Sequence, residues 1–431
     1  MIWILAGVVL AGAVQDFMVL FVSTRRDGRS LGELVKEEMG PTAGVLALVA
    51  CFMIMVIILA VLAMIVVKAL THSPWGTYTV AFTIPLAIFM GIYIRYLRPG
   101  RIGEVSVIGL VMLVFAIVSG GWVAESSTWA PWFDYTGVQL TWILVGYGFI
   151  AAVLPVWLLL APRDYLSTFL KIGTIVGLAI GILIMRPTLT MPALTKFIDG
   201  TGPVWSGSMF PFLFITIACG AISGFHSLVG SGTTAKQLNS EKDARPIAYG
   251  GMLIECALAI ISLCAVGYVW KFYSAGELVV PTNVFATGIS KMTSTIPFLK
   301  GAESVIFSML VLAVSAFCLT SLDTATRLAR YMFQEFWLEP GEEVKSVTGY
   351  KKVLTNPYVA TIITVVLGIA LGMTGYANVW PLFGAANQLL AALGLLAVAT
   401  WLGKVGKNNK MFLGSDGFYA DCNHYFAVPH N

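Results

Sequence analysis

The sequence predicts an all-α polytopic membrane protein with about 11 transmembrane helices, each long enough to cross a bilayer. Of its 431 residues, 58% are hydrophobic and only 11% are charged, and the mean hydropathy is +0.85. A soluble chain carries about 25% charged residues. Apolar runs recur along nearly the whole chain and are continuous, whereas the strands of an outer-membrane β-barrel alternate apolar and polar residues. These observations exclude a soluble domain or a barrel as the fold class.

The apolar runs give the expected spans in chain order. They lie near residues 2–22, 43–67, 76–95, 105–124, 139–161, 168–185, 209–230, 247–270, 303–322, 357–376 and 380–402. Most of the 26 lysines and arginines fall in the loops of one side of this arrangement. Because positive residues accumulate on the cytoplasmic side, we expect the first residue outside and the last span to end in the cytoplasm.

The span count also predicts the domain organisation. We expect one transmembrane transporter domain over 1–410, with an incomplete first repeat over 1–124, an intervening helix hairpin and loop over 125–208, a second repeat over 209–402, and an atypical tail over 411–431. The chain enters the membrane at its first residues and has an odd number of spans. One further helix before it would make the two repeats equal in length and opposite in orientation, the inverted-repeat plan of many secondary transporters. We therefore expect the sequence to be truncated at its N-terminus.

The seventh span contains the stretch GAISGFHSLVGSGTT, residues 220–234, with four glycines. Each glycine lowers helix stability by about 1 kcal/mol relative to alanine. Unwound backbone cannot face lipid, so it must line a cavity enclosed by protein, and transporters bind substrates at such breaks. The alternative is a packing face, because Gly220 and Gly224 match a small-residue contact motif. The packing face leaves the neighbouring hydroxyls and the histidine unexplained. The candidate substrate ligands here are Ser223, Gly224, His226 and Ser227.

Two carboxylates lie inside spans, where a charge costs at least about 2.5–3.5 kcal/mol on insertion scales. Glu255 is either hydrogen-bonded to a neighbouring helix or a carrier of a proton or cation. Asp16 follows Gln15 near the cytoplasmic end of the first span. For Asp16 we favour an ion pair with Arg25 or Arg26.

The ninth span ends in LTSLDTATRLARY, a run of hydroxyl and carboxylate oxygens at helical spacing. Sodium is a hard cation that prefers oxygen ligands. Thr320, Ser321 and Thr324 are therefore candidate sodium ligands, and Asp323 is a second candidate for proton coupling. The alternative is helix capping with an ion pair between Asp323 and Arg327, four positions apart.

Other polar groups complete the candidates. Asn387 and Gln388 in the last span would either hydrogen-bond the substrate or join helices. Tyr147 is interpreted as an interfacial or packing group, and Arg163 and Lys171 as cytoplasmic loop charges. Catalytic motifs, metal-ligand spacings and basic runs are absent from the sequence. We therefore expect no enzymatic activity, no cofactor and no nucleic-acid partner.

Several stretches resemble the carbon starvation protein A family. They are AGAVQDFMVLFVSTRRDGRSLGELVKEEMGPTAG, PRDYLSTFLKIGTI, GAISGFHSLVGSGTT, LDTATR and WPLFGAANQ. Members are bacterial inner-membrane proteins linked to starvation responses that take up peptides or pyruvate. The resemblance covers the chain from Met1 to about Lys410 and implies an inverted-repeat fold like that of amino-acid and polyamine transporters. Family members carry a further helix before the MIW segment and continue with further helices where this chain reads MFLGSDGFYADC.

These expectations combine into one functional hypothesis. The chain would be a multi-pass secondary transporter of the bacterial cytoplasmic membrane that imports pyruvate or small peptides during carbon starvation, by symport with H⁺ or Na⁺. The ligands at the helix break would contact the substrate with Asn387 and Gln388 opposite, and Glu255 or Asp323 would carry the proton. The alternative is a nutrient-binding membrane sensor that moves no substrate.

Overall fold

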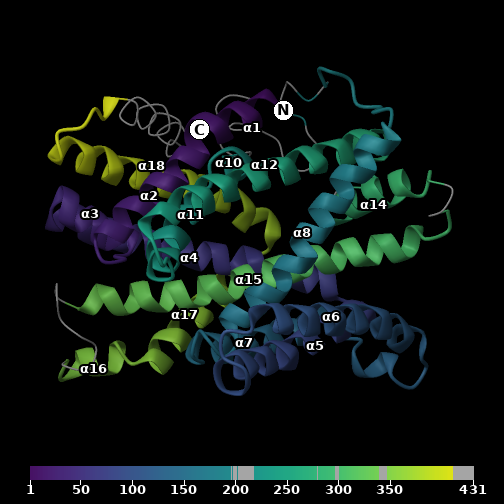
Figure 1. Ribbon diagram of the computed structural model, residues 1–431, viewed down its shortest axis with the longest axis horizontal. Helices are drawn as coiled ribbons and strands as arrows, with labels where there is room; N and C mark the ends of the chain where they lie inside the picture. The colour runs from purple at the N-terminus through teal and green to yellow at the C-terminus, as the bar shows by residue number, and fades with distance from the viewer. Residues whose placement is uncertain are drawn as a thin grey trace. The chain divides into compact units, whose positions relative to one another are not determined.

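The fold is built entirely from helices in the part of the chain that the computed structural model describes: residues 1–195, 197, 201, 218–278, 280–296, 300–338 and 347–410 (Figure 1). Eight of these helices are long and apolar enough to cross a membrane, and two apolar helices are shorter. This confirms the prediction of an all-α polytopic membrane protein. The first part of the expected seventh span, 209–217, and the tail from 411 lie outside the described residues.

Internal contacts divide the chain into two compact units. Unit 1 comprises Met1–Val61, Leu194–Ile260 and Leu328–Asn431, and unit 2 comprises Leu62–Ala193 and Ile261–Arg327. Helices α4 (Pro41–Leu70), α12 (Ala244–Tyr268) and α15 (Glu303–Trp337) each contribute to both units. The two repeats expected from the sequence are defined by orientation in the membrane, which this division does not test, so they stay a prediction.

Unit 1 contains the broken seventh span. This span is formed by α10 (Ala218–Ala221) and α11 (Gly224–Gly232). The other helices of unit 1, in chain order, are α1 (Ile2–Gly7), the π-helical η1 (Val8–Gly12), α2 (Ala13–Arg25), α3 (Leu31–Met39), the short η6 (Thr234–Lys236) and η7 (Glu241–Asp243), α16 (Tyr350–Leu354), α17 (Pro357–Gly372) and α18 (Tyr376–Lys404). Helices α2, α11 and α18 pack against one another. Their common core includes Val19, Val22, Ile222 and Leu395, all at most 2% exposed. This packing fixes α11 to two neighbours along its length.

A network of ion pairs joins α3 to the ends of α2 and α18. The side chain of Glu38 is fully buried and lies between two cations, 2.7 Å from Nη2 of Arg26 and 3.1 Å from Nζ of Lys404. Arg26 also contacts Glu37 at 2.9 Å. A buried carboxylate must be paired to remain charged, so these contacts hold the three helix ends together.

Unit 2 contains the remaining helices. They are α5 (Pro74–Ile92) with the π-helical η2 (Tyr93–Leu97), α6 (Ile102–Glu125), the short η3 (Ala130–Trp132), α7 (Gly137–Val153), α8 (Leu160–Met185), α13 (Trp270–Ser274) and α14 (Pro281–Thr293). Helices α5, α6 and α8 pack around one apolar cluster. The cluster includes Leu86, Met90, Val105, Leu113 and Leu166. This packing directs one face of α8 toward the interior of the unit.

The boundary between α7 and α8 differs from the expected spans of 139–161 and 168–185. Helix α7 ends at Val153 because Leu154 precedes Pro155, and a residue before proline avoids the helical conformation. Leu154 is extended, with φ −60° and ψ 150°. Helix α8 then begins at Leu160, so Arg163 lies inside the helix and is 2% exposed. The interpretation of Arg163 as a loop charge is therefore wrong.

Candidate functional site

The seventh span is interrupted between α10 and α11, where Ile222 and Ser223 are not helical. Ser223 is extended, with φ −98° and ψ 110°. Side chains from two neighbouring helices satisfy the freed backbone groups. Nε2 of Gln15 donates to the Ser223 carbonyl at 2.9 Å, and the backbone N–H of Phe225 donates to Oδ1 of Asn387 at 2.9 Å. The helix break predicted from the glycines is confirmed, and protein groups rather than lipid satisfy its backbone, as a membrane interior requires.

Glycines on both sides of the break permit this close packing. A Cβ atom on Gly224 would lie 1.9 Å from the Asn387 carbonyl oxygen, and one on Gly12 would lie 2.3 Å from the Ala221 carbonyl oxygen. A Cβ on Gly220 would make only an ordinary contact, at 3.7 Å from the Ala259 Cβ. Close packing of the helices therefore requires glycine at positions 224 and 12, but it does not require glycine at position 220.

His226 lies at the start of α11 with a carboxylate at each ring nitrogen. Its Nδ1 is 2.7 Å from Oδ2 of Asp16, and its Nε2 is 3.0 Å from Oε2 of Glu255. The Asp16 side chain is 7% exposed, whereas those of His226 and Glu255 are 30% and 31% exposed. We call these three residues the histidine–carboxylate triad.

The arginines expected to pair with Asp16 have other partners. Arg25 contacts Glu241 at 2.8 Å, and Arg26 contacts Glu37 and Glu38. The expected ion pair between Asp16 and either arginine is therefore wrong. The physical reason is the helical spacing: Asp16 faces α11, while the arginines lie where α2 ends.

The triad has a simple charge balance. A protonated imidazole donates from both ring nitrogens, so it suits two carboxylate acceptors. With both carboxylates ionised, the triad then carries one net negative charge, and one more proton makes it neutral. Such an arrangement pairs the imidazole with the carboxylates at membrane depth, where an unpaired charge is costly.

Three polar atoms around the break have no hydrogen-bond partner within the described part of the chain. They are Oε1 of Gln15, Oδ1 of Asp16 and Nδ2 of Asn387, all buried. Two are acceptors and one is a donor. Buried polar atoms are rarely left unpaired, so they point to a bound polar species or water. The hydroxyl of Ser227, in contrast, has a partner: it accepts a second hydrogen bond from Nε2 of Gln15, at 2.9 Å.

Of the expected substrate ligands, unit 1 brings the residues of the break together with Asn387. Gln388 follows Asn387 on α18 and is 1% exposed. Glu255 joins the same group through His226. The sequence did not assign Gln15 a role, although a polar pair at positions 15 and 16 inside an apolar span was the available signal.

Asp323, the other candidate for proton coupling, lies in unit 2 in a second polar cluster. Its Oδ2 accepts from Nη1 of Arg163 at 2.8 Å and from the hydroxyl of Tyr147 at 2.6 Å. Arg163 also donates to the Tyr147 hydroxyl. Arg327 instead donates to the carbonyls of Ala151 and Leu154 at the end of α7. The expected pair between Asp323 and Arg327 is thus replaced by a pair with Arg163.

The candidate sodium ligands on α15 have a cation beside them already. Nζ of Lys171 donates to Oγ1 of Thr320 at 3.1 Å, and that hydroxyl donates to the carbonyls of Ala316 and Phe317. An ammonium at this oxygen opposes a sodium ion by charge repulsion. Ser321 and Thr324 follow on the same helix.

Sequence reasoning missed the roles of Arg163, Tyr147 and Lys171. The available signal was the stretch PRDYLSTFLK, in which Arg163, Ser167 and Lys171 recur at every fourth position. Residues spaced by four share one face of a helix. Extending the sixth span back to Leu160 would have placed the arginine and the serine toward the unit's interior.

Comparisons with known proteins identify relatives of this chain. The chain is 58% identical to the peptide transporter CstA of Escherichia coli K12, over 94% of this chain and 65% of that protein. It is 45% identical to the pyruvate/proton symporter BtsT of the same strain, over 92% of this chain and 65% of the relative. It is 36% identical to the peptide transporter CstA of Bacillus subtilis 168, over 96% of this chain and 73% of the relative. The chain thus spans about two thirds of the length of these relatives.

The relatives are bacterial proteins named as transporters rather than as enzymes, and the described residues contain eight helices that are long and apolar enough to cross a membrane, which suits such a protein. The chain is therefore a multi-pass protein of the bacterial cytoplasmic membrane. The family model described as carbon starvation protein CstA matches residues 1–276 and 273–415, which together cover most of the chain. With this match and these identities, the chain belongs to the carbon starvation protein CstA family.

Proposed function

We propose that this protein is a secondary active transporter that imports pyruvate or a short peptide together with a proton. The observation that carries the proposal is the histidine–carboxylate triad, in which both ring nitrogens of His226 face carboxylates beside the helix break. The names of the relatives, a peptide transporter and a pyruvate/proton symporter, support the same substrate classes and the same coupling ion.

Within the triad, Glu255 is the proposed proton carrier. Its side chain is 31% exposed, whereas that of Asp16 is 7% exposed. Protons reach the more open carboxylate, and the buried Asp16 orients the imidazole from its other side. The ammonium of Lys171 beside Thr320 favours proton coupling over sodium coupling, because it places a fixed positive charge at the candidate sodium ligands.

The substrate carboxylate would bind at the start of α11, which has nine residues. A helix N-terminus carries a partial positive charge that favours anions. Nδ2 of Asn387 is a buried donor without a partner among the described residues, and it lies on the side chain that already binds the Phe225 N–H. Ser223, His226 and Ser227 complete the proposed site, together with Gly224 and Gln388.

Uptake by the purified chain in proteoliposomes tests the proposal. Labelled pyruvate and labelled dialanine are supplied with an inward proton gradient or an inward sodium gradient. We expect accumulation with the proton gradient and its loss when a protonophore is added. The variant His226→Gln should lose accumulation, whereas His72→Gln, at an exposed histidine of a loop, should keep it.

Two results would overturn this function. If neither gradient drives accumulation of either substrate by the parent chain, symport is wrong. If the parent chain binds pyruvate or dialanine with no accumulation under any gradient, the protein acts as a nutrient-binding receptor instead.

A further inference from the structure

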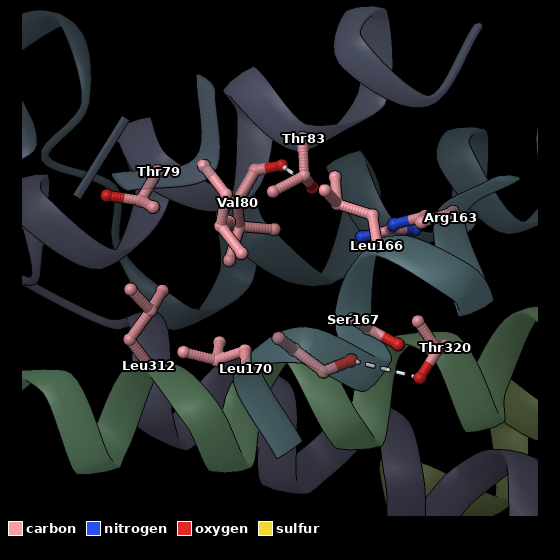
Figure 2. Close-up of a pocket in the computed structure, with 11 residues that line it drawn as sticks. Thr79, Val80, Thr83, Arg163, Leu166, Ser167, Leu170, Leu312 and Thr320 are labelled. Atoms are coloured by element: carbon pink, nitrogen blue, oxygen red, sulfur yellow. Dashed lines mark hydrogen bonds between the residues drawn. The ribbon is translucent and has the colours of Figure 1, made fainter. Parts of the chain in front are cut away.

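A group of exposed arginines lies on the surface of unit 2. The interior of this unit contains a pocket lined by α5, α6, α8 and α15, and Figure 2 shows it with Thr79 and Thr320 among its residues. The pocket has a volume of about 20 Å³, which is room for about one water molecule. A pocket of this size holds no larger ligand, whereas the arginines on the surface are open to one.

The arginines lie where α5 and α6 are joined. Arg95 is in η2, which continues α5, and Arg98 and Arg101 are in the connection that ends where α6 begins. All three are exposed. The helical segments on both sides, Pro74–Leu97 and Ile102–Glu125, are long and apolar enough to cross a membrane. The three cations therefore lie at the end of two such segments, where the lipid head groups begin.

Exposed apolar side chains alternate with the arginines along the chain. Tyr96 and Leu97, just before the connection, are 66% and 60% exposed, and Ile102, just after it, is 55% exposed. Apolar side chains exposed at the end of a membrane-crossing helix lie against acyl chains, which are as apolar as they are. This surface thus presents apolar groups beside cations, the combination that a phospholipid also has beside its phosphate.

An aromatic ring holds one of the arginines in place. Cζ of Arg95 lies 4.4 Å from the centroid of the Trp157 ring, and Tyr96 packs edge-on against the same ring with the centroids 5.7 Å apart. The backbone at Trp157 fits closely against α5, because a Cβ on Gly91 would lie 2.7 Å from the Trp157 carbonyl oxygen. A cation–π contact positions a guanidinium without neutralising it. Arg95 is therefore fixed at the surface and still charged.

The cations outnumber the acidic groups at this surface. Glu104, in the first turn of α6, accepts from the Tyr93 hydroxyl at 2.7 Å, and its Oε2 lies 3.9 Å from Nη1 of Arg98. Neither Arg95 nor Arg101 forms an ion pair within the described part of the chain. Three arginines and one glutamate leave two net positive charges. Since a guanidinium binds phosphate oxygens through parallel N–H donors, the surface is suited to a phosphate group.

We propose that the surface formed by η2, the connection to α6 and Trp157 binds the head group of an anionic phospholipid, with Arg95 and Arg101 at its phosphate. The acyl chains then lie along the exposed apolar side chains of α5 and α6. A phospholipid fits better than a soluble anion, because it meets both the cations and the apolar groups beside them. The site goes beyond the proposed symport, since no residue of the histidine–carboxylate triad takes part.

Native mass spectrometry of the purified protein in a neutral detergent tests the site. Dioleoyl phosphatidylglycerol, which carries a net negative charge, is mixed with an equal amount of dioleoyl phosphatidylcholine, whose choline cation is repelled by a positive surface. We expect the first lipid bound to be phosphatidylglycerol, and an equal concentration of soluble glycerol phosphate to leave it bound. Equal binding of the two lipids, or displacement by glycerol phosphate, would overturn the proposal.

Three variants make the test specific. Arg95→Gln/Arg101→Gln changes two exposed residues and should weaken phosphatidylglycerol binding by about thirtyfold, because each basic residue near a membrane surface contributes about fivefold. Lys407→Gln/Lys410→Gln is the matched control, which removes two charges from exposed lysines after α18 and should bind like the parent. Trp157→Leu keeps every charge but releases Arg95 from the ring, so its loss of affinity should be smaller than that of the arginine double variant.

The same variants define how the proposal fails. An arginine double variant that binds phosphatidylglycerol as tightly as the parent would place the lipid elsewhere. Equal losses in the arginine and lysine double variants would show that the lipid responds to the net charge of the protein and not to this surface. A Trp157→Leu protein that folds and binds like the parent would remove the ring from the site. If Trp157→Leu does not fold, the arginine double variant and its lysine control decide the question.

Discussion

The imidazole of His226 lies 2.7 Å from the Asp16 carboxylate, which comes 210 positions earlier in the chain. The contact joins the first residues of α11 to α2 inside unit 1. Asp16 is nearly buried, and its second oxygen has no partner among the described residues. His226 is therefore the one partner of the Asp16 carboxylate among the described residues, and the proposed role of the triad makes the charge of Asp16 testable.

Asp16→Asn keeps the size of the side chain and removes this charge. Without the carboxylate, a protonated imidazole loses one of its two anionic partners, so we expect the rate of proton-driven pyruvate uptake to fall at least tenfold, about 1.4 kcal/mol. Initial rates in proteoliposomes measure the effect. Glu241→Gln is the matched control, because Glu241 forms an exposed pair with Arg25 and should change uptake little. Equal rates for Asp16→Asn and the parent would remove Asp16 from the mechanism.

Glu255→Gln separates proton carriage from substrate binding. Net uptake needs a proton to cross with the substrate, whereas exchange of labelled for unlabelled substrate does not. We expect the variant to lose net uptake driven by a proton gradient and to retain exchange. Both are measured in the same proteoliposomes. Loss of exchange together with net uptake would show that Glu255 holds the substrate or the fold instead.

Gly224→Ala tests the close packing at the break. The added Cβ would lie 1.9 Å from the Asn387 carbonyl oxygen, so α11 and α18 must separate. Overpacking of this kind costs about 1–3 kcal/mol, and a lower unfolding temperature in detergent should report it. Gly250→Ala on α12 is the matched control, because a Cβ there meets nothing within 4 Å and alanine favours a helix by about 1 kcal/mol. A Gly224→Ala protein as stable as the Gly250→Ala protein would contradict the packing.

Asn387→Leu removes the acceptor of the Phe225 N–H. A buried N–H left without a partner costs about 1–3 kcal/mol, so the variant should unfold at a lower temperature than the parent. Asn387→Asp keeps the acceptor oxygen and should restore most of the lost stability. If the aspartate and leucine variants are equally unstable, the loss comes from packing and not from the hydrogen bond.

Glu38→Gln tests the ion network at the ends of α2, α3 and α18. Glu38 is buried between Arg26 and Lys404, and removing one partner of a buried network costs about 3–5 kcal/mol. The exposed pair of Arg25 and Glu241 is the comparison, since such a pair contributes about 0–1 kcal/mol. Unfolding temperatures should therefore fall far more for Glu38→Gln than for Glu241→Gln. Similar losses for both would show that Glu38 is solvated in the protein.

Local patterns in the sequence predicted the class of fold and the helix break. Long apolar runs require helices in a bilayer, and the glycines beside Ser223 and His226 weaken one helix at a definite point. The partners of these residues could not be predicted. The pairing of His226 with Asp16 and Glu255, and of Arg163 with Asp323, depends on how helices distant in the sequence pack, and helical periodicity shows only which side of its own helix a residue occupies.

The π-helical turn η1 bears on how this site could change. It lies between α1 and α2 and ends at Gly12, three residues before Gln15, and it holds one residue more than a turn of α-helix needs. If η1 relaxed to an α-helix, the helix beyond it would advance by one residue, a rotation of about 100°. Gln15 would leave the Ser223 carbonyl and Asp16 would leave His226 in one step. The turn would then switch the site between two states. A distance measured by spectroscopy between labels at positions 15 and 223 would show two separate values.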